Sequence, residues 1–320
     1  MINRRHLFLS VAASTASTAL QAKPCEPEAS SPNAAEQQVR SSKPSEGSIE
    51  KTESSSKQTD EPPDRIDTNV SLFQWPFRKL PLDEAKKLKL RLNSLGFKQA
   101  WAGSFEGIFQ RDLRSVNDRL AAICAKDDFY QPFGSVNLNA LDWKNDLLRC
   151  LTDHQMPGIR LHPNYHGYDL DRDEVNELLE ITSKHHSIVQ IASAVEDTRT
   201  QNQQFSVPDT DLTPLIRKIS DHPTAQVQIL NYRPRGNIAQ KLVSMRQLHF
   251  DTARLDGTDG IATWIKQTSP DRILYGSHAP FLIPEATLIR MRESQLAPET
   301  QQKLFYSNAD NLAAAGRNAS

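Results

Sequence analysis

The stretch GIRLHPNYHGYDLDRDEVNELLEITSKHHSIVQIA, residues 158–192, decides the fold class. It opens with a short apolar run at 158–162 and closes with a second, rich in β-branched residues, at 188–192. Between them, residues 173–184 carry apolar side chains at the three- and four-residue spacing of an amphipathic helix. Two strands joined by a helix form a parallel βαβ unit. The segment therefore predicts an α/β fold.

The same alternation of strand and helix runs through residues 65–315. We expect strands at 66–72, 99–103, 133–137, 158–162, 188–192, 227–231, 248–251 and 273–276. We expect helices at 82–95, 111–126, 142–150, 173–184, 211–220, 238–245 and 260–268, and further helices at the C-terminal end. Eight such units in about 250 residues predict a (β/α)8 TIM barrel. An open doubly wound sheet is the alternative, but the first turn, Leu72 to Pro76, has no GxGxxG pattern.

The N-terminal residues differ from the barrel segment. Arg4 and Arg5 precede an apolar run to about Leu20, so residues 1–22 are predicted to be a twin-arginine-type signal segment. This predicts export to the periplasm or another extracytoplasmic compartment, with a cytoplasmic location as the alternative. The run is shorter than the roughly 20 apolar residues of a spanning helix, so no stable membrane insertion is expected after signal removal. Residues 23–64 are Ser, Glu, Lys, Gln and Pro with few apolar residues, which predicts a disordered linker.

Charge and cysteine content exclude some classes of protein. The 38 Lys and Arg balance 39 Asp and Glu, so there is no basic excess and no nucleic-acid partner is expected. Three cysteines provide no disulfide framework, and we expect Cys124 and Cys150 to be small buried side chains. The partner expected for the barrel is a small-molecule substrate.

Polar residues stand at nearly every strand end. The active site of a TIM barrel lies at the C-terminal ends of its strands. The residues expected there are Asp67, Asn69, Ser104, Asn137, His162, Glu196, Asp197, Asn231, Asp251 and His278. Because a purely structural barrel could end its strands in almost any residue, this convergence predicts an enzyme or a ligand-binding site.

Three of these residues are the catalytic candidates. His278 could act as a general base, since imidazole titrates near neutral pH. Asp67 could ligate a cation or orient His278, or it could be a buried carboxylate paired with Arg78 or Arg160. His162 is expected at a strand tip, pointing inward, where it could complete a cation site or be a hydrogen-bonded rim residue.

Other residues are candidates for holding a substrate. Asn69 and Asn231 are poor zinc ligands but good hydrogen-bonding groups. Trp75 could wall the pocket and Arg78 could anchor an anion, or both could belong to a packing corner. Glu196 could enter the pocket or pair locally with Arg199. The full substrate-binding set is Asn69, Trp75, Arg78, Asn137, His166, Glu196 and Asn231, with His166 expected in a loop because Pro163 follows His162.

Four motifs in order, IDTNVSLFQWPFRKLP, GIRLHPNYHGYDL, VEDTRTQ and ILYGSHAPF, resemble the amidohydrolase-related barrels, the amidohydrolase 2 group of metal-dependent hydrolases. The resemblance covers residues 65 to about 313. It implies a divalent metal held by an HxH pair on strand 1, by histidines ending strands 5 and 6, and by an aspartate ending strand 8. This sequence departs at each place, with Asp67-Thr68-Asn69 on strand 1, no histidine on strand 5, Asn231 on strand 6 and His278 on strand 8.

The expected function is hydrolysis of a small carboxylic, amide or lactone compound. By resemblance, His278 takes the place of the catalytic aspartate and would activate a water, alone or with one divalent ion such as zinc. Asp67, His162 and His278 are the ligands expected for that ion. The alternatives are a decarboxylase or lyase of the same superfamily, a non-catalytic small-molecule-binding barrel, and a secreted interaction domain.

Overall fold

The computed structural model describes residues 64–202 and 204–317. The predicted signal segment, and all of the predicted linker except Asp64, lie outside these described residues. Within the described part of the chain, no helix is both long and apolar enough to cross a membrane.

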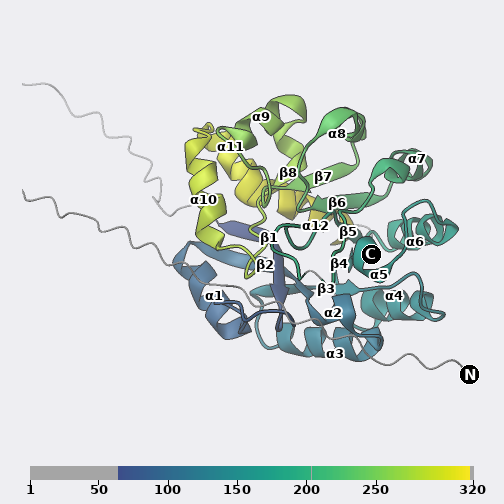
Figure 1. Ribbon diagram of the computed structural model, residues 1–320. Coiled ribbons are helices and arrows are strands. Elements are labelled where there is room, and N and C mark those ends of the chain that lie inside the picture. The colour runs from purple at the N-terminus through teal and green to yellow at the C-terminus, as the bar shows by residue number, and fades with distance from the viewer. Residues whose placement is uncertain (1–63, 203, 318–320) are drawn as a thin grey trace, which may run out of the picture. The chain divides into compact units, whose positions relative to one another are not determined.

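The strands form a single closed barrel (Figure 1). The eight strands follow one another in chain order and every neighbouring pair is parallel. They are β1 (Arg65–Leu72), β2 (Phe97–Ser104), β3 (Tyr130–Ser135), β4 (Gly158–Leu161), β5 (Ile188–Ala192), β6 (Gln226–Leu230), β7 (Leu248–Asp251) and β8 (Ile273–Leu274). The last strand region returns to the first, since Thr68 N donates to Tyr275 O at 2.9 Å and Ser71 N donates to Ala279 O at 2.9 Å. The predicted TIM barrel is confirmed.

Helices surround this ring of strands. They are α1 (Ala85–Ser94), α2 (Glu106–Phe109), α3 (Leu113–Cys124), α4 (Trp143–Thr152), α5 (Pro163–His166), α6 (Asp173–Lys184), α7 (Thr213–Asp221), α8 (Gly236–Ser244), α9 (Gly260–Gln267), α10 (Pro284–Glu293), α11 (Pro298–Gln302) and α12 (Asn308–Arg317), with a 3-10 turn η1 (Pro270–Arg272) and a π turn η2 (Lys303–Ser307).

Helix α6 shows why the sequence folds this way. Val175, Leu178 and Leu179 are buried on the face toward the strands, at the spacing of one helical stripe. Asp173 opens the helix and Lys184 closes it, so each charge complements the helix dipole. These bounds are the ones that the periodicity predicts.

The barrel interior contains a polar layer that periodicity does not predict. Arg160 is 2% exposed, and its Nε donates to Gln190 Oε1 at 2.9 Å. Gln190 Nε2 donates to Gln228 Oε1 at 2.8 Å, and Gln228 Nε2 donates to Thr68 Oγ1 at 2.8 Å. The layer therefore satisfies its own hydrogen bonds across β1, β4, β5 and β6.

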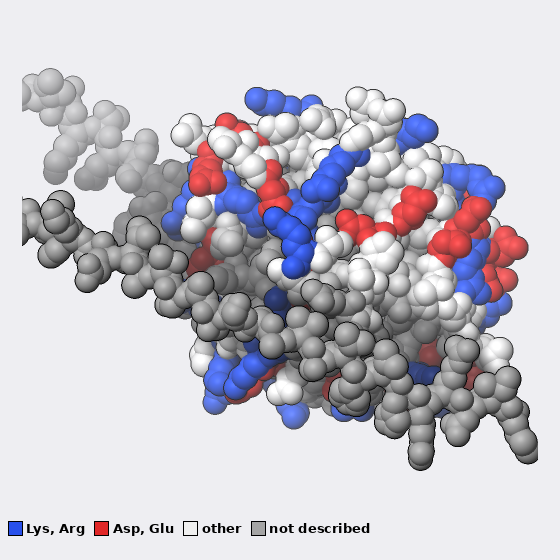
Figure 2. All heavy atoms as spheres, in the orientation of Figure 1, with Lys and Arg blue, Asp and Glu red and all other residues white. Residues whose placement is uncertain are grey.

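Two further observations concern surface charge and cysteine. Acidic and basic side chains are interspersed on the face shown in Figure 2. Cys124 and Cys150 are free and buried as predicted, and burial raises the pKa of each thiol to about 12.

Candidate active site at the C-terminal mouth

Two asparagines and an aspartate meet between the C-terminal half of β1 and the ends of β6 and β7. Asn69 Nδ2 donates to Asp251 Oδ2 at 2.6 Å and to Asn231 Oδ1 at 2.9 Å. The Asn231 backbone N–H donates to the same Asp251 carboxylate, at 3.0 and 3.1 Å. All three residues are at most 3% exposed. The predicted strand-end residues Asn69 and Asn231 are thus brought together, but they bond to each other and to Asp251.

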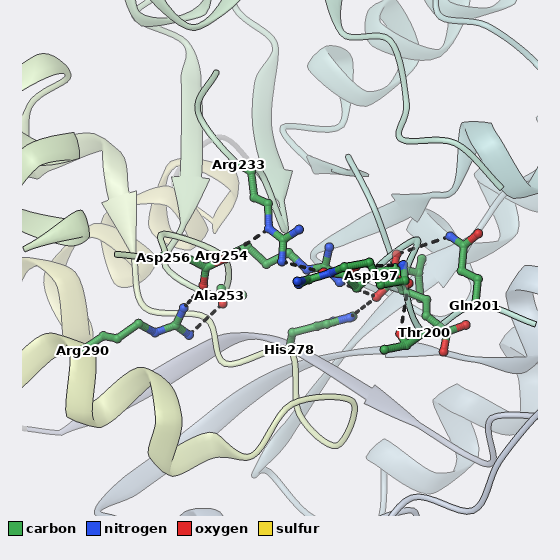
Figure 3. A network of polar contacts seen from close by, with 12 residues as sticks. Asp197, Thr200, Gln201, Arg233, Ala253, Arg254, Asp256, His278 and Arg290 are labelled. Carbon is green, nitrogen blue, oxygen red and sulfur yellow. Dashed lines mark hydrogen bonds and ion pairs between the residues drawn. The ribbon is translucent and has the colours of Figure 1, made fainter. Parts of the chain in front are cut away.

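His278 joins this group through Asn231. Asn231 Nδ2 lies 3.3 Å from His278 Nδ1 and donates its other hydrogen to Ala194 O at 2.7 Å. His278 Nε2 lies 2.7 Å from Val195 O (Figure 3). Because a carbonyl can only accept, the His278 proton is on Nε2 and Nδ1 accepts from the amide. Burial and the charge of Arg254 lower the pKa of His278 to about 3, so the ring is neutral at physiological pH.

The backbone adopts unusual conformations just after β6 and β8. Asn231 has a φ of 57° and His278 a φ of 58°, in the left-handed region. A Cβ at Gly276 would lie 2.8 Å from the Asp251 Cβ and 3.0 Å from the Asn69 Cβ. The glycine therefore permits β8 to approach β7 and β1 closely enough for the hydrogen-bonded group to form.

Asp67 lies deeper, and it is fully buried. Its Oδ1 accepts from Asn69 N at 3.1 Å and from Ser277 N at 3.0 Å, while its Oδ2 has no partner of good hydrogen-bond geometry among the described residues. The Ser277 hydroxyl lies beside the carboxyl and opposes the rise of its pKa. Burial raises the pKa of this carboxyl to about 7 against the opposing hydrogen bonds. The structure shows no ion pair between Asp67 and Arg78 or Arg160, the alternative that the sequence left open.

Asp251 was expected at the strand ends but was not among the predicted catalytic or substrate-binding residues. It is fully buried, and burial raises its pKa to about 6. It accepts three hydrogen bonds from Asn69 and Asn231. Its place at the end of a predicted strand indicated that it would lie near the site. Nothing in the sequence indicated that it would accept hydrogen bonds from Asn69 and Asn231.

A short helix, and not the expected loop, follows His162 and ends at His166. Pro163 is the first residue of α5, a position where proline costs no hydrogen bond. The two imidazole centroids lie 6.1 Å apart, and His166 Nε2 lies 2.9 Å from Gly107 O. His162 is 4% exposed, its Nδ1 has no partner among the described residues, and burial lowers its pKa.

These residues do not fit a metal ion. Among the described residues, no group of three His, Cys, Asp or Glu is placed to hold one, and this includes the set Asp67, His162 and His278. Both His278 nitrogens are already engaged. The nearby side chains of Asn69 and Asn231 are neutral amides, which are weak ligands for a divalent ion, and they are hydrogen-bonded to each other.

An aromatic cluster covers the mouth. Trp75 is 3% exposed and makes edge contacts, with centroids 5.2 to 6.2 Å apart, with Phe77, Phe105, Phe109, Tyr165 and Phe281. The Phe281 ring stacks on His278 at 5.2 Å. Trp75 therefore reaches the hydrogen-bonded group only through Phe281, and its role as a wall of the pocket stays a prediction.

The remaining predicted residues lie at the rim. Arg78 Nη1 is 3.6 Å from Glu196 Oε1, and its guanidinium lies 4.7 Å from the centroid of Phe281. Arg199 pairs with Asp197 at 2.9 Å, so the local Glu196–Arg199 pair is not the one formed. Asn137 is not brought to the group: its Oδ1 accepts from Asn139 N at 3.0 Å, in a turn after β3.

A cavity of about 570 Å³ opens at the other end of the strands, beside Trp101, Gln131, His185 and Leu312. The buried titratable groups described above lie instead at the C-terminal ends, the end where barrel enzymes carry their chemistry. We therefore place the candidate site at the mouth and not in this cavity.

Several solved structures have a similar fold. No family model and no curated protein matches the chain. A putative amidohydrolase from Staphylococcus aureus superposes with a TM-score of 0.61 at 13% identity, over 78% of this chain and 99% of that one. A 2,6-dihydroxybenzoate decarboxylase from Rhizobium gives 0.61 at 15% identity, over 78% and 99%. A 5-carboxyvanillate decarboxylase from Novosphingobium aromaticivorans with bound manganese gives 0.61 at 14%, over 78% and 97%.

These likenesses cover 97 to 99% of each matched chain and 78% of this one. At such identities they establish the fold, which agrees with the resemblance carried by the four motifs. The chain has the barrel fold of the amidohydrolase-related proteins.

Proposed function

We propose that this chain removes the carboxylate of a small carboxylic compound as CO2 at the C-terminal mouth of the barrel, with Asp67 as the proton donor. The observation that carries the proposal is the buried Asp67 carboxyl, with a pKa of about 7 and an Oδ2 that has no partner of good hydrogen-bond geometry among the described residues. A carboxyl with that pKa can both give and recover a proton near neutral pH.

The proposed reaction is a decarboxylation in which protein side chains and water supply the proton. The bond between the substrate carbon and its carboxylate breaks, the electron pair stays on the carbon, and CO2 leaves. The proton on Asp67 moves to that carbon, and the resulting Asp67 carboxylate takes a proton from water. The aromatic cluster around Trp75 keeps bulk water from the reacting carbon.

Hydrolysis, the reaction first expected, has less support from the geometry. It needs a base that activates water, and His278 has a pKa of about 3 and two engaged nitrogens. Solved structures of similar fold include decarboxylases for dihydroxybenzoate and carboxyvanillate. Some of those proteins contain manganese, whereas the amides of Asn69 and Asn231 are weak ligands for a divalent ion.

A second candidate, a non-catalytic binding barrel, is favoured by one observation. The hydrogen bonds among Asn69, Asn231, Asp251 and His278 use both hydrogens of each amide and both nitrogens of the imidazole. A group so fully satisfied holds its shape without a substrate.

The test is CO2 release from small aromatic carboxylic acids, compared between the unchanged chain, Asp67→Asn and the exposed control Asp142→Asn. We expect release by the unchanged chain and the control, and loss of at least about 100-fold in Asp67→Asn. Hydrolysis of esters, amides or lactones without CO2 release would establish the hydrolase. Ligand-dependent melting shifts without either reaction would establish the binding barrel.

We also propose export of the chain, on the strength of Arg4 and Arg5 and the apolar run after them. Replacement of both arginines by lysine should retain the full-length protein in the cytoplasmic fraction of a bacterial host. Unchanged fractionation would contradict the proposal.

A further inference from the structure

Arg254, three residues after the end of β7, is a buried cation without a carboxylate partner. It is 4% exposed. Its single hydrogen bond runs from Nη2 to Val195 O over 3.4 Å, and its Nε has no partner among the described residues. No carboxylate of the described residues lies within ion-pair distance of its guanidinium.

Neighbouring acidic side chains are bound to other arginines (Figure 3). Arg233 pairs with Asp197 at 3.0 Å and with Asp256 at 3.1 Å, and Arg290 pairs with Asp256 at 2.7 Å. Burial is the main reason that the pKa of Arg254 is lowered, with Arg233 adding to it and the more distant acids opposing it.

A buried guanidinium without an anion is unfavourable, and its five donors form a planar fork that matches a carboxylate. Arg254 also lies at the candidate site, because Val195 O accepts both from Arg254 and from His278 Nε2 at 2.7 Å. We infer that Arg254 is the binding residue for the carboxylate of an organic ligand at the mouth. This inference rests on the proposed function, which places the substrate at the C-terminal mouth. It adds that Arg254 is the residue that binds the carboxylate of that substrate.

The surroundings narrow the class of ligand. Phe281 stacks on His278, and Trp75 contacts Phe281 at 5.2 Å, so aromatic surface lies beside the anion site. Glu196 is 4% exposed and pairs with Arg78 at 3.6 Å, so Arg78 is not free to balance a second negative group. An aromatic monocarboxylate therefore fits better than phosphate or a dicarboxylate.

The experiment is calorimetric titration with benzoate, benzamide and inorganic phosphate, which reports binding without turnover. We expect benzoate to bind the unchanged chain and to bind Arg254→Gln about 10- to 100-fold more weakly, since a hydrogen-bonded charge is lost. Arg254→Lys, which keeps the charge but loses the planar fork, should fall between them. The exposed Arg235→Gln should bind benzoate normally, and phosphate should bind no variant.

A second measurement excludes a merely structural role. Without ligand, Arg254→Gln should melt at the same temperature as the unchanged chain or higher, because a buried unpaired charge is removed. A lower melting temperature with unchanged benzoate affinity would overturn the inference, as would failure of the unchanged chain to bind benzoate at millimolar concentration. If benzoate binding depends on Arg254 but no CO2 is released, only the proposed function is contradicted. If CO2 is released and Arg254→Gln binds benzoate normally, only this inference is contradicted.

Discussion

Asn231 fixes the orientation of the residues around it through its side-chain hydrogen bonds. Its side-chain carbonyl accepts from Asn69, and its amide hydrogens go to Ala194 O and His278 Nδ1. A buried amide with every hydrogen bond made holds its neighbours in one orientation, so Asn231 fixes His278, whose pKa is lowered by burial and by Arg254. The imidazole at the tip of the last strand is therefore a positioned acceptor and donor, and not a free base.

Replacement of Asn231 by alanine should lower the free energy of unfolding by about 2–4 kcal/mol. The reason is that Ala194 O, His278 Nδ1 and one Asn69 hydrogen lose their partners in a buried place. Urea denaturation measures the loss. The exposed Asn237→Ala is the matched control, and an equally small change in both variants would show that the group contributes little.

At the scale of elements, Arg160 connects several strands through one side chain. From β4 it donates to Val70 O and Ser71 Oγ of β1 at 2.8 and 3.2 Å, and to Gln190 of β5 at 2.9 Å. Gly103 of β2 leaves room for it, since a Cβ there would lie 2.7 Å from Arg160 Nη1. The guanidinium is thus a bridge inside the barrel.

Arg160→Gln should therefore cost about 3 kcal/mol of unfolding free energy, because several buried acceptors lose a charged donor. Thermal and urea unfolding, compared with the exposed Arg111→Gln, give the measurement. Equal midpoints for the two variants would mean that water or other side chains replace the bridge.

The elements themselves could be predicted because their signals are local. The bounds of α6, β5 and β7 follow from the spacing of apolar residues within each segment. The prediction of a loop after His162 was wrong because Pro163 was treated as a helix breaker, although proline is favoured at the first helical position.

Contacts within the site could not be predicted to the same degree. Asn69 and Asp251 are 182 positions apart in the chain, and only closure of the barrel brings them together. Strand ends were enough to predict the group to which Asn69, Asn231 and His278 belong. They could not predict that these side chains would bond to one another, since that depends on side-chain directions at positive φ.

At the scale of the whole molecule, the barrel should be stable without a divalent ion. No set of three ligating side chains among residues 64–202 and 204–317 converges on one point. Purified protein should contain well under one equivalent of zinc or manganese, and EDTA should leave its melting temperature unchanged. A melting temperature that falls with EDTA and recovers with one added ion would contradict this prediction.

The free energy of unfolding should depend on pH through two buried groups whose pKa values are shifted in opposite directions. His278 has a lowered pKa, so its contribution is present above its unfolded pKa of about 6.5 and is lost as pH falls toward 3. Asp67 has a raised pKa, so its contribution is present below its unfolded value of 3.8 and is lost as pH rises through about 7. The pH dependence of the unfolding free energy contains both contributions. Comparison of the unchanged chain with a variant at one of the two residues separates them.

Asp67→Asn isolates the carboxyl. Below about pH 4 the variant and the unchanged chain should differ little, because a neutral group is buried in both. Between pH 4 and 7 the variant should gain relative stability by up to about 1.4 kcal/mol per pH unit, and above pH 7 the difference should become constant. Urea unfolding at half-unit pH steps measures this, with the exposed Asp142→Asn as the matched control. A flat difference for Asp67→Asn as well would mean that the buried carboxyl titrates near its ordinary pKa, which would remove the proton donor from the proposed reaction.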